Sequence, residues 1–171
     1  AIDRAASGIA PVWSGSRKNM LPLESLRVIA VEQYGAGPFG TLFMADLGAE
    51  VIKIENPHDG GDMARSVGPD YLDNGESLFF HAFNRNKKSI TLDLQHERAR
   101  DVLHSLVETS DCVFNNLRGD LPARLGLDYE SLGPVHPAIV CCSLSAFGRT
   151  GPRAAEPGYD YLMQAYAGWM S

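Results

Sequence analysis

Short apolar runs alternate with helical periodicity along most of this chain of 171 residues. Five runs rich in β-branched residues predict strands, at 27–31, 50–55, 89–94, 111–116 and 138–145. Apolar residues recur at the spacing of one helix face between positions 99 and 107, which predicts an amphipathic helix over 97–108. Further helices are expected within 77–83, at 38–47, where Pro38 suits the first turn and Gly48 the end, and at 159–170.

Strands that alternate with helices predict an α/β fold, an open, mainly parallel, Rossmann-like sheet with helices on both faces. Ligands bind such sheets at the carboxyl ends of the strands, so the loops after Val31, Glu55, Asn116 and Ser145 are the expected functional region. Residues 56–76 are rich in Gly, Asp and Pro and predict a long loop without structure of its own. Residues 1–21 lack periodicity and are expected to be a flexible lead-in or linker, which leaves 22–171 as the folded domain.

Composition narrows the class of protein. Hydrophobic residues make up 44% and charged residues 21% of the chain, which is typical of a folded globular domain. A formal net charge of -6 argues against a nucleic-acid binder. No apolar run approaches the ~20 residues that cross a bilayer, and the N-terminal residues lack an apolar signal region. A cytoplasmic protein without a membrane partner is therefore the default expectation.

Cysteine and histidine patterns indicate no special chemistry. The three cysteines, Cys112, Cys141 and Cys142, are odd in number and form no C-x-x-C motif, so we predict buried, reduced thiols. The segment HDGGD at 58–62 carries possible metal ligands, but no second cluster has the spacing that a metal site needs. We expect no metal site.

The most conspicuous motif is a glycine-rich segment, GAGPFG, at 35–40, with Glu55 located 20 residues after Gly35. It matches the dinucleotide-binding pattern G-x-G-x-x-G followed by an acid for the ribose. In that pattern the first glycine follows its strand at once, whereas Glu32, Gln33 and Tyr34 intervene here. Glu32 would also repel a pyrophosphate. A glycine-rich loop fitted to another ligand is favoured; nicotinamide or flavin binding and a simple turn stay as alternatives.

The order of several segments is more specific than any one motif. These are GAGPFGTLFMADLGAEVIKIENP (35–57), GDMAR (61–65), FNRNKKSITLDL (83–94), DCVFNNLRGDLPARLGLDYESL (111–132), SAFGRTGP (145–152) and PGYD (157–160). In this order they resemble the family III CoA-transferases, the group that includes formyl-CoA transferase, carnitine CoA-transferase and α-methylacyl-CoA racemase. The resemblance runs from about residue 21 to residue 171.

The resemblance implies that coenzyme A or an acyl-CoA is a substrate, with no tightly bound cofactor. By position, the CoA contacts of the family correspond here to Tyr34, Gly35, Asn56, Leu92, Asn116, Leu117 and Arg124. The phosphates of CoA favour cations, and Arg124 and the cluster Arg85, Lys87 and Lys88 are basic within an acidic chain. Alternatively, the cluster is a solvated turn, Leu92 a core residue and Asn116 a turn former.

The resemblance also implies covalent catalysis, in which an aspartate attacks the acyl-CoA thioester and becomes an aspartyl-CoA thioester. In the family this aspartate follows the helix that GYD begins, so we expect it beyond Ser171, together with a second domain and an interlocked homodimer. The 171 residues are then expected to be the N-terminal part of a protein more than twice as long. Tyr159 and Asp160 are expected at the active-site entrance, with a helix cap as the alternative for Asp160.

Two other functions stay open within this interpretation. Racemases of the family carry histidine where this chain has Tyr159, and a phenol with a pKa near ~10 is poorly suited to move an α-proton, so transferase is favoured. A CoA-binding fragment without turnover is the remaining alternative, because the 171 residues alone are expected to be inactive.

Overall fold

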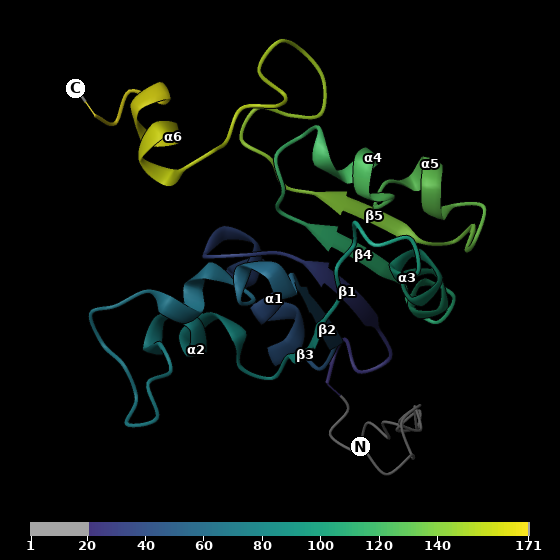
Figure 1. Ribbon diagram of the computed structural model, residues 1–171, viewed down its shortest axis with the longest axis horizontal. Helices are drawn as coiled ribbons and strands as arrows, with labels where there is room; N and C mark the ends of the chain where they lie inside the picture. Colours follow the sequence, from purple (N-terminus) through teal and green to yellow (C-terminus); the bar gives the residue numbers. More distant parts are fainter. Residues whose placement is uncertain (1–20, 171) are drawn as a thin grey trace, which may run out of the picture.

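The structure, a computed structural model, describes residues 21–170, so all but the last residue of the predicted lead-in at 1–21 lies outside the described residues. Five strands form one parallel sheet: β1 (Arg27–Val31), β2 (Glu50–Glu55), β3 (Lys88–Thr91), β4 (Cys112–Asn115) and β5 (Val140–Ser143). Their order is β3-β2-β1-β4-β5 (Figure 1). The direction of strand addition reverses between β1 and β4, which is where such sheets bind ligands. The predicted fold class is confirmed.

Helices cover both faces of this sheet (Figure 1). On one face lie α1 (Ala36–Asp46) and α2 (Leu78–Asn84), and on the other lie α3 (Ala99–Val107), α4 (Leu121–Leu125) and α5 (Tyr129–Leu132). Gly48 ends the α1 turn with a positive φ of 103°, as its place in the sequence predicts. Within residues 21–170 no helix is long and apolar enough to cross a membrane.

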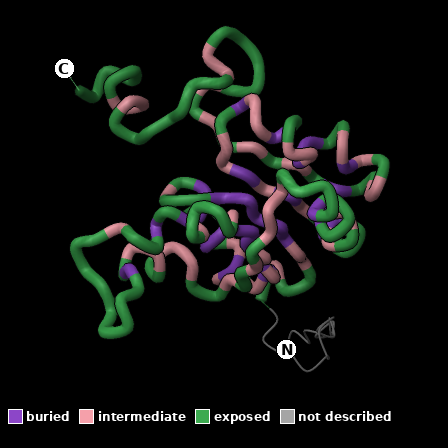
Figure 2. The backbone as a smooth tube through the Cα atoms, in the orientation of Figure 1, coloured by how far each residue is buried: buried purple, intermediate pink, exposed green. Residues whose placement is uncertain are grey.

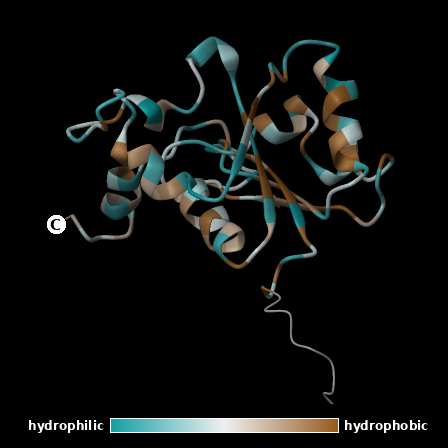
Figure 3. Cartoon of the chain, turned by 90° about the horizontal axis from the view of Figure 1, so that it is seen from below, coloured by the Kyte–Doolittle hydropathy of each residue, from teal (hydrophilic) through white to brown (hydrophobic). Residues whose placement is uncertain are grey.

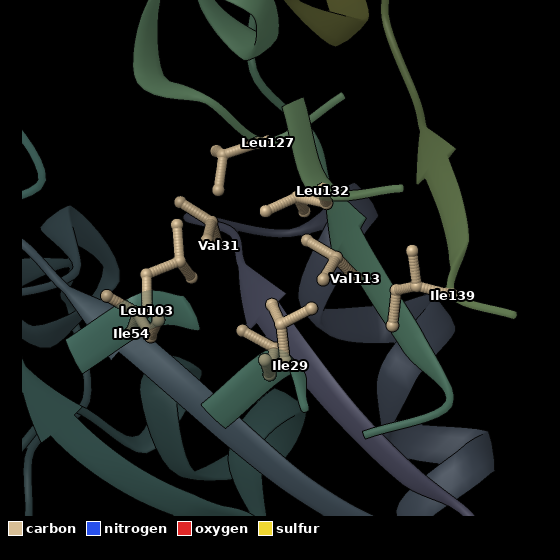
Figure 4. Packing of buried hydrophobic residues seen from close by; sticks show 9 residues of the cluster. Ile29, Val31, Ile54, Leu103, Val113, Leu127, Leu132 and Ile139 are labelled. Carbon is tan, nitrogen blue, oxygen red and sulfur yellow. The ribbon is translucent and has the colours of Figure 1, made fainter. Parts of the chain in front are cut away.

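The alternation of side chains along β1 divides the core in two. Ile29 and Val31 pack with Leu103 of α3 and Leu132 of α5 (Figure 4), whereas Val28 and Ala30 join the cluster under α1. Strands buried on both faces consist of near-continuous apolar runs, which explains the strand signal in the sequence (Figure 3). Figure 2 shows the same central strands as the most buried part of the chain.

The segment at 56–76 differs from its prediction, because it is not structureless. It contains the short 3-10 helices η1 (Pro57–Asp59) and η2 (Met63–Ser66) and a bridge between Tyr71 and Ser77. The side chain of Asn56 accepts a hydrogen bond from the backbone of His58, and Asp62 accepts one from the backbone of Ala64. These side-chain caps hold the loop in a fixed course after β2.

Two other predictions need correction. The last helix, α6 (Asp160–Tyr166), is shorter than expected and lies away from the sheet, with its residues mostly exposed (Figures 1 and 2). The cysteines are not uniformly buried, because Cys142 is exposed on the edge strand β5. Burial raises the pKa of the half-buried Cys112 thiol to about 11, so that cysteine is unreactive at neutral pH.

Candidate functional site

A cavity of about 520 Å³ opens at the carboxyl ends of the strands, as the sheet topology predicts. It is lined by the ends of β1 and β2, by the turn that joins β3 to α3, and by the segment 117–125 after β4. This volume lies in the range of small-molecule sites. The cavity is therefore the candidate binding site.

Four of the seven predicted CoA contacts line the cavity. Asn56 comes from the end of β2, Leu92 from the end of β3, and Leu117 and Arg124 from the segment after β4. Leu92 and Leu117 also pack against the core under α3, so they form part of both the cavity wall and the core. Residues separated by up to 68 positions in the sequence, from Asn56 to Arg124, are brought together here.

The other three predicted contacts lie outside the lining of this cavity. Asn116 braces the loop after β1, because its amide accepts a hydrogen bond from the backbone N–H of Gln33 (2.9 Å) and donates one to the carbonyl of Gln33 (2.9 Å). Tyr34 has a φ of 67° and places its ring 5.1 Å from that of Phe79, and Gly35 precedes α1 at its N-cap. They shape the loop that forms one wall of the cavity.

Tyr159 and Asp160 also lie outside the cavity lining. The Tyr159 ring stacks on that of Tyr161 at 5.6 Å, and the Asp160 carboxylate accepts a hydrogen bond from Gln164 one turn later in α6. No side-chain cap is present at the start of α6, so the alternative role of Asp160 as a helix cap is not what the structure has.

The glycine-rich loop has a packing explanation. A Cβ on Gly37 would lie 2.6 Å from Cγ of Asn116, so this glycine is required by the amide that braces the loop. Gly40 faces open space. Glu55, the acid in the ribose position of the dinucleotide pattern, is buried and hydrogen-bonded to Arg65, Ser89 and the backbone N–H of Asp62. Two residues of the dinucleotide pattern, the second glycine (Gly37) and the acid (Glu55), therefore have structural roles in this fold.

The pKa of the Glu55 carboxyl group is lowered in this environment. Burial alone would raise its pKa, but the hydrogen bonds from Arg65, Ser89 and the Asp62 N–H outweigh burial and lower the pKa to about 2. The carboxylate is therefore ionised at neutral pH and holds the segment after β2 against the sheet.

A buried ion network that the sequence analysis missed adjoins the cavity, and its carboxylates, Glu32 and Asp62, belong to the cavity lining. Lys53 Nζ lies 2.7 Å from Asp62 and 3.8 Å from Glu32, and Lys87 Nζ lies 2.8 Å from Glu32. All four side chains are at most 2% exposed. Burial lowers the pKa of Lys87, and the Glu32 carboxylate opposes that shift. The sequence feature that could have indicated this network is Lys53 within the apolar run of β2, because a buried lysine needs a carboxylate partner.

The predicted basic cluster does not face the cavity. Arg85 pairs with Asp46, Lys88 pairs with Glu50, and Lys87 belongs to the buried network. The arginines that line the cavity are Arg124, one of the expected CoA contacts, and Arg100, which the sequence analysis did not single out. Arg100 occupies the first turn of the helix that follows β3, and this position could have indicated it. Among residues 21–170 no group of acids, histidines and cysteines is arranged to hold a metal ion.

Comparisons with known proteins agree with this geometry. The model of CoA-transferase family III matches residues 23–171. The chain is 44% identical over 155 residues to the succinate–glutarate CoA-transferase of Agrobacterium fabrum, a match that covers 88% of this chain and 38% of that protein. It is 42% identical over 149 residues to the acetyl-CoA:oxalate CoA-transferase of Acetobacter aceti, covering 87% of this chain and 38% of that protein.

Solved structures give the same result. A CaiB/BaiF family protein from Brucella suis is 41% identical and superposes with a TM-score of 0.79, covering 87% of this chain and 40% of that one. The protein Rv3272 of Mycobacterium tuberculosis is 37% identical with a TM-score of 0.78, covering 88% of this chain and 41% of that one. The chain thus spans about two fifths of the length of the relatives that it matches.

Proposed function

The chain belongs to CoA-transferase family III, and from this premise we propose that it is the CoA-binding part of an enzyme that moves CoA from an acyl-CoA to a free carboxylic acid. The observation that carries the proposal is the cavity at the carboxyl ends of the strands, lined by Asn56, Leu92, Leu117 and Arg124. The two leucines offer apolar wall to the adenine or pantetheine, and the Arg124 guanidinium suits a phosphate oxygen.

The reaction proceeds through an aspartyl-CoA thioester. An aspartate carboxylate attacks the acyl carbonyl of the thioester, the C–S bond breaks, and a mixed anhydride and CoA thiolate result. The thiolate then attacks the aspartyl carbonyl, which releases the donor acid and leaves aspartyl-CoA. The acceptor carboxylate then attacks the carbonyl of aspartyl-CoA, the C–S bond breaks, and a second mixed anhydride and CoA thiolate result. The thiolate attacks the acceptor's carbonyl in this anhydride, which releases the free aspartate and yields the new acyl-CoA.

We place the nucleophile outside the 171 residues, in the part of the relatives' length that this chain does not span. Asp160, the carboxylate in the GYD segment, is exposed and hydrogen-bonded within its own helix, which does not favour it as the nucleophile. In the complete protein we expect an interlocked homodimer, and a cytoplasmic location stays a prediction.

The names of the relatives support a proposal for the substrate class. The enzyme of Agrobacterium fabrum is named for succinate and glutarate, and that of Acetobacter aceti for acetyl-CoA and oxalate, so each name includes at least one dicarboxylic acid. A third, 37% identical over 171 residues, is the succinyl-CoA:glutarate CoA-transferase of Mus musculus. We propose that the enzyme containing this chain exchanges CoA between short dicarboxylic acids.

The test is an exchange assay on the natural protein that contains this chain. We expect succinyl-CoA and glutarate to give glutaryl-CoA and succinate, and incubation with succinyl-CoA alone to leave CoA covalently attached, as seen by intact mass. The Asp160→Asn variant is expected to form the same adduct, because Asp160 is not the nucleophile.

The outcomes separate the alternatives. An adduct that disappears in Asp160→Asn would relocate the nucleophile into this chain. CoA binding without exchange for any dicarboxylate would favour a binding protein without turnover. Bound flavin, or NADH binding with none for CoA, would favour the oxidoreductase alternative and overturn the proposal.

A further inference from the structure

A second cavity, of about 240 Å³, lies between α3 and α4 beside the first. Its polar lining residues are Arg100, His104, Arg124 and Ser131, and neither aspartate nor glutamate contributes to its lining. Two arginines, a histidine and a hydroxyl around one small cavity are unexpected in a chain with a formal net charge of -6. Such a set of donors without a carboxylate suits an anion.

The two cavities lie next to each other. Arg100, Leu103, Arg124 and Leu125 line both of them. The two arginines therefore stand at the junction, within reach of one ligand that extends from the first cavity into the second.

The fold places these side chains for simple reasons. Ala99, Leu103 and Val107 bury the opposite side of α3 in the core, so Arg100 and His104, four residues apart, lie together on the flank that faces the cavity. On the other wall, α4 ends at Gly126, whose left-handed φ of 69° stops the helix directly after Arg124 and Leu125. Both walls are thus fixed by the core and by a helix end.

The linings of the two cavities differ in charge. Six carboxylates line the first cavity, belonging to Glu32, Glu55, Asp59, Asp62, Asp93 and Glu97. Three of these are paired with buried or partly buried cations and Asp93 lies 3.0 Å from His58, whereas Asp59 and Glu97 are exposed. A dianionic group is therefore favoured in the second cavity over the first, because the second has arginines but no carboxylate in its lining.

Both guanidinium groups are available for a ligand. Within residues 21–170, no carboxylate lies within ion-pair distance of Arg100. Arg124 lies 3.4 Å from Asp120 one turn earlier, in an exposed pair of the kind that contributes little. Neither arginine is held by a strong internal partner, so a phosphate does not have to displace one.

We propose that the second cavity is a phosphate subsite in which Arg100, together with Arg124, binds the phosphomonoester on the ribose of CoA. This group is dianionic near neutral pH and matches the fork of a guanidinium. His104 and Ser131 supply further hydrogen-bonding groups around it. The inference rests on the proposed function, since it takes CoA as the ligand, and it makes this subsite the place where CoA is distinguished from dephospho-CoA, which lacks that phosphate.

The experiment compares CoA with dephospho-CoA by calorimetric titration of the natural protein that contains this chain. Wild-type protein is expected to bind CoA about 10–100-fold more tightly than dephospho-CoA, the range for losing a charge-assisted contact. Arg100→Gln is expected to weaken CoA binding about 10-fold and to leave dephospho-CoA binding within about twofold. Arg98→Gln is the matched control, because Arg98 is an exposed arginine two residues earlier that lines neither cavity.

Two results would overturn the subsite while leaving the proposed function intact. One is unchanged CoA affinity in Arg100→Gln. The other is an equal loss for CoA and dephospho-CoA, since Arg100 would then act on a part that both ligands share. If wild-type protein binds neither ligand, the proposed function fails, and the inference fails with it.

Discussion

At the scale of single residues, Glu55 links acid stability to the course of the chain after β2. Its carboxylate binds Arg65, Ser89 and the backbone N–H of Asp62, and its pKa is lowered to about 2. Because the folded pKa lies below the ordinary value of 4.5, the group stabilises the fold above about pH 4.5 and loses this contribution as the pH falls towards 2.

Replacing Glu55 should therefore change stability in a pH-dependent way. We expect Glu55→Gln to lower the free energy of unfolding by roughly 2–3 kcal/mol at pH 7 and by progressively less below pH 4.5. Urea unfolding at several pH values measures this. Glu130→Gln serves as control, because that side chain is 75% exposed and its pair with Arg149 at 3.5 Å should contribute little. A constant difference between pH 7 and pH 3 would contradict the assignment.

Arg100 shows why residue type alone does not identify a contact. The chain has 15 lysines and arginines. In the most conspicuous cluster, at 85–88, the three cations form ion pairs with Asp46, Glu32 and Glu50. A cation can bind a ligand only where its own fold leaves it without a stronger internal partner. Which arginine meets this condition depends on neighbours that are distant in the sequence.

At the scale of elements, α1 contains two glycines with different roles. Gly37 is buried against the Asn116 amide, whereas Gly40 is exposed and would have no atom within 4 Å of an added Cβ. Alanine is intrinsically better than glycine inside a helix by about 1 kcal/mol. The same substitution should thus have opposite effects at two positions of one helix.

We expect Gly40→Ala to stabilise the protein by about 0.5–1 kcal/mol and Gly37→Ala to destabilise it by about 1–3 kcal/mol. The loss at Gly37 follows because the new methyl group displaces Asn116, which then releases the backbone of Gln33. Thermal unfolding of the two variants provides the comparison, with each acting as the control of the other. Equal shifts in Tm would show that Asn116 does not constrain this helix.

At the scale of the whole molecule, one face of the edge strand β5 is uncovered. Val140 is 60% exposed and Leu144, just after the strand, is 46% exposed, with Cys142 exposed between them. Side chains two apart on a strand share a face, so these three form one apolar strip beside an unpaired strand edge. Such a strip favours association.

The 171-residue chain is therefore expected to self-associate as its concentration rises, and Val140→Lys with Leu144→Lys should shift it towards the monomer. Sedimentation velocity over a concentration series measures this. Val102→Lys is the control, because Val102 is similarly exposed at 46% but lies on α3, on the other face of the sheet. An unchanged sedimentation profile in the double variant would exclude the β5 strip as the contact.

The order of strands and helices and the class of fold were predictable from the sequence. A parallel strand covered on both faces must be apolar almost throughout, and an amphipathic helix must repeat its apolar residues every three or four positions. Burial therefore leaves a local pattern, visible at 27–31, 50–55 and 97–108. The family was predictable for another reason, because long segments such as NRNKKSITLDL are specific in themselves.

The tertiary structure alone decided which of the candidate residues share a cavity. Asn56, Leu92 and Arg124 meet because parallel strands end at one edge of the sheet, whereas Asn116 turns to Gln33 and Lys87 to Glu32. Arg100 reaches the same cavity through the orientation of α3 on the core. Hydrogen bonds and ion pairs depend on distances between side chains that the fold brings together, and no local pattern in the sequence encodes those distances.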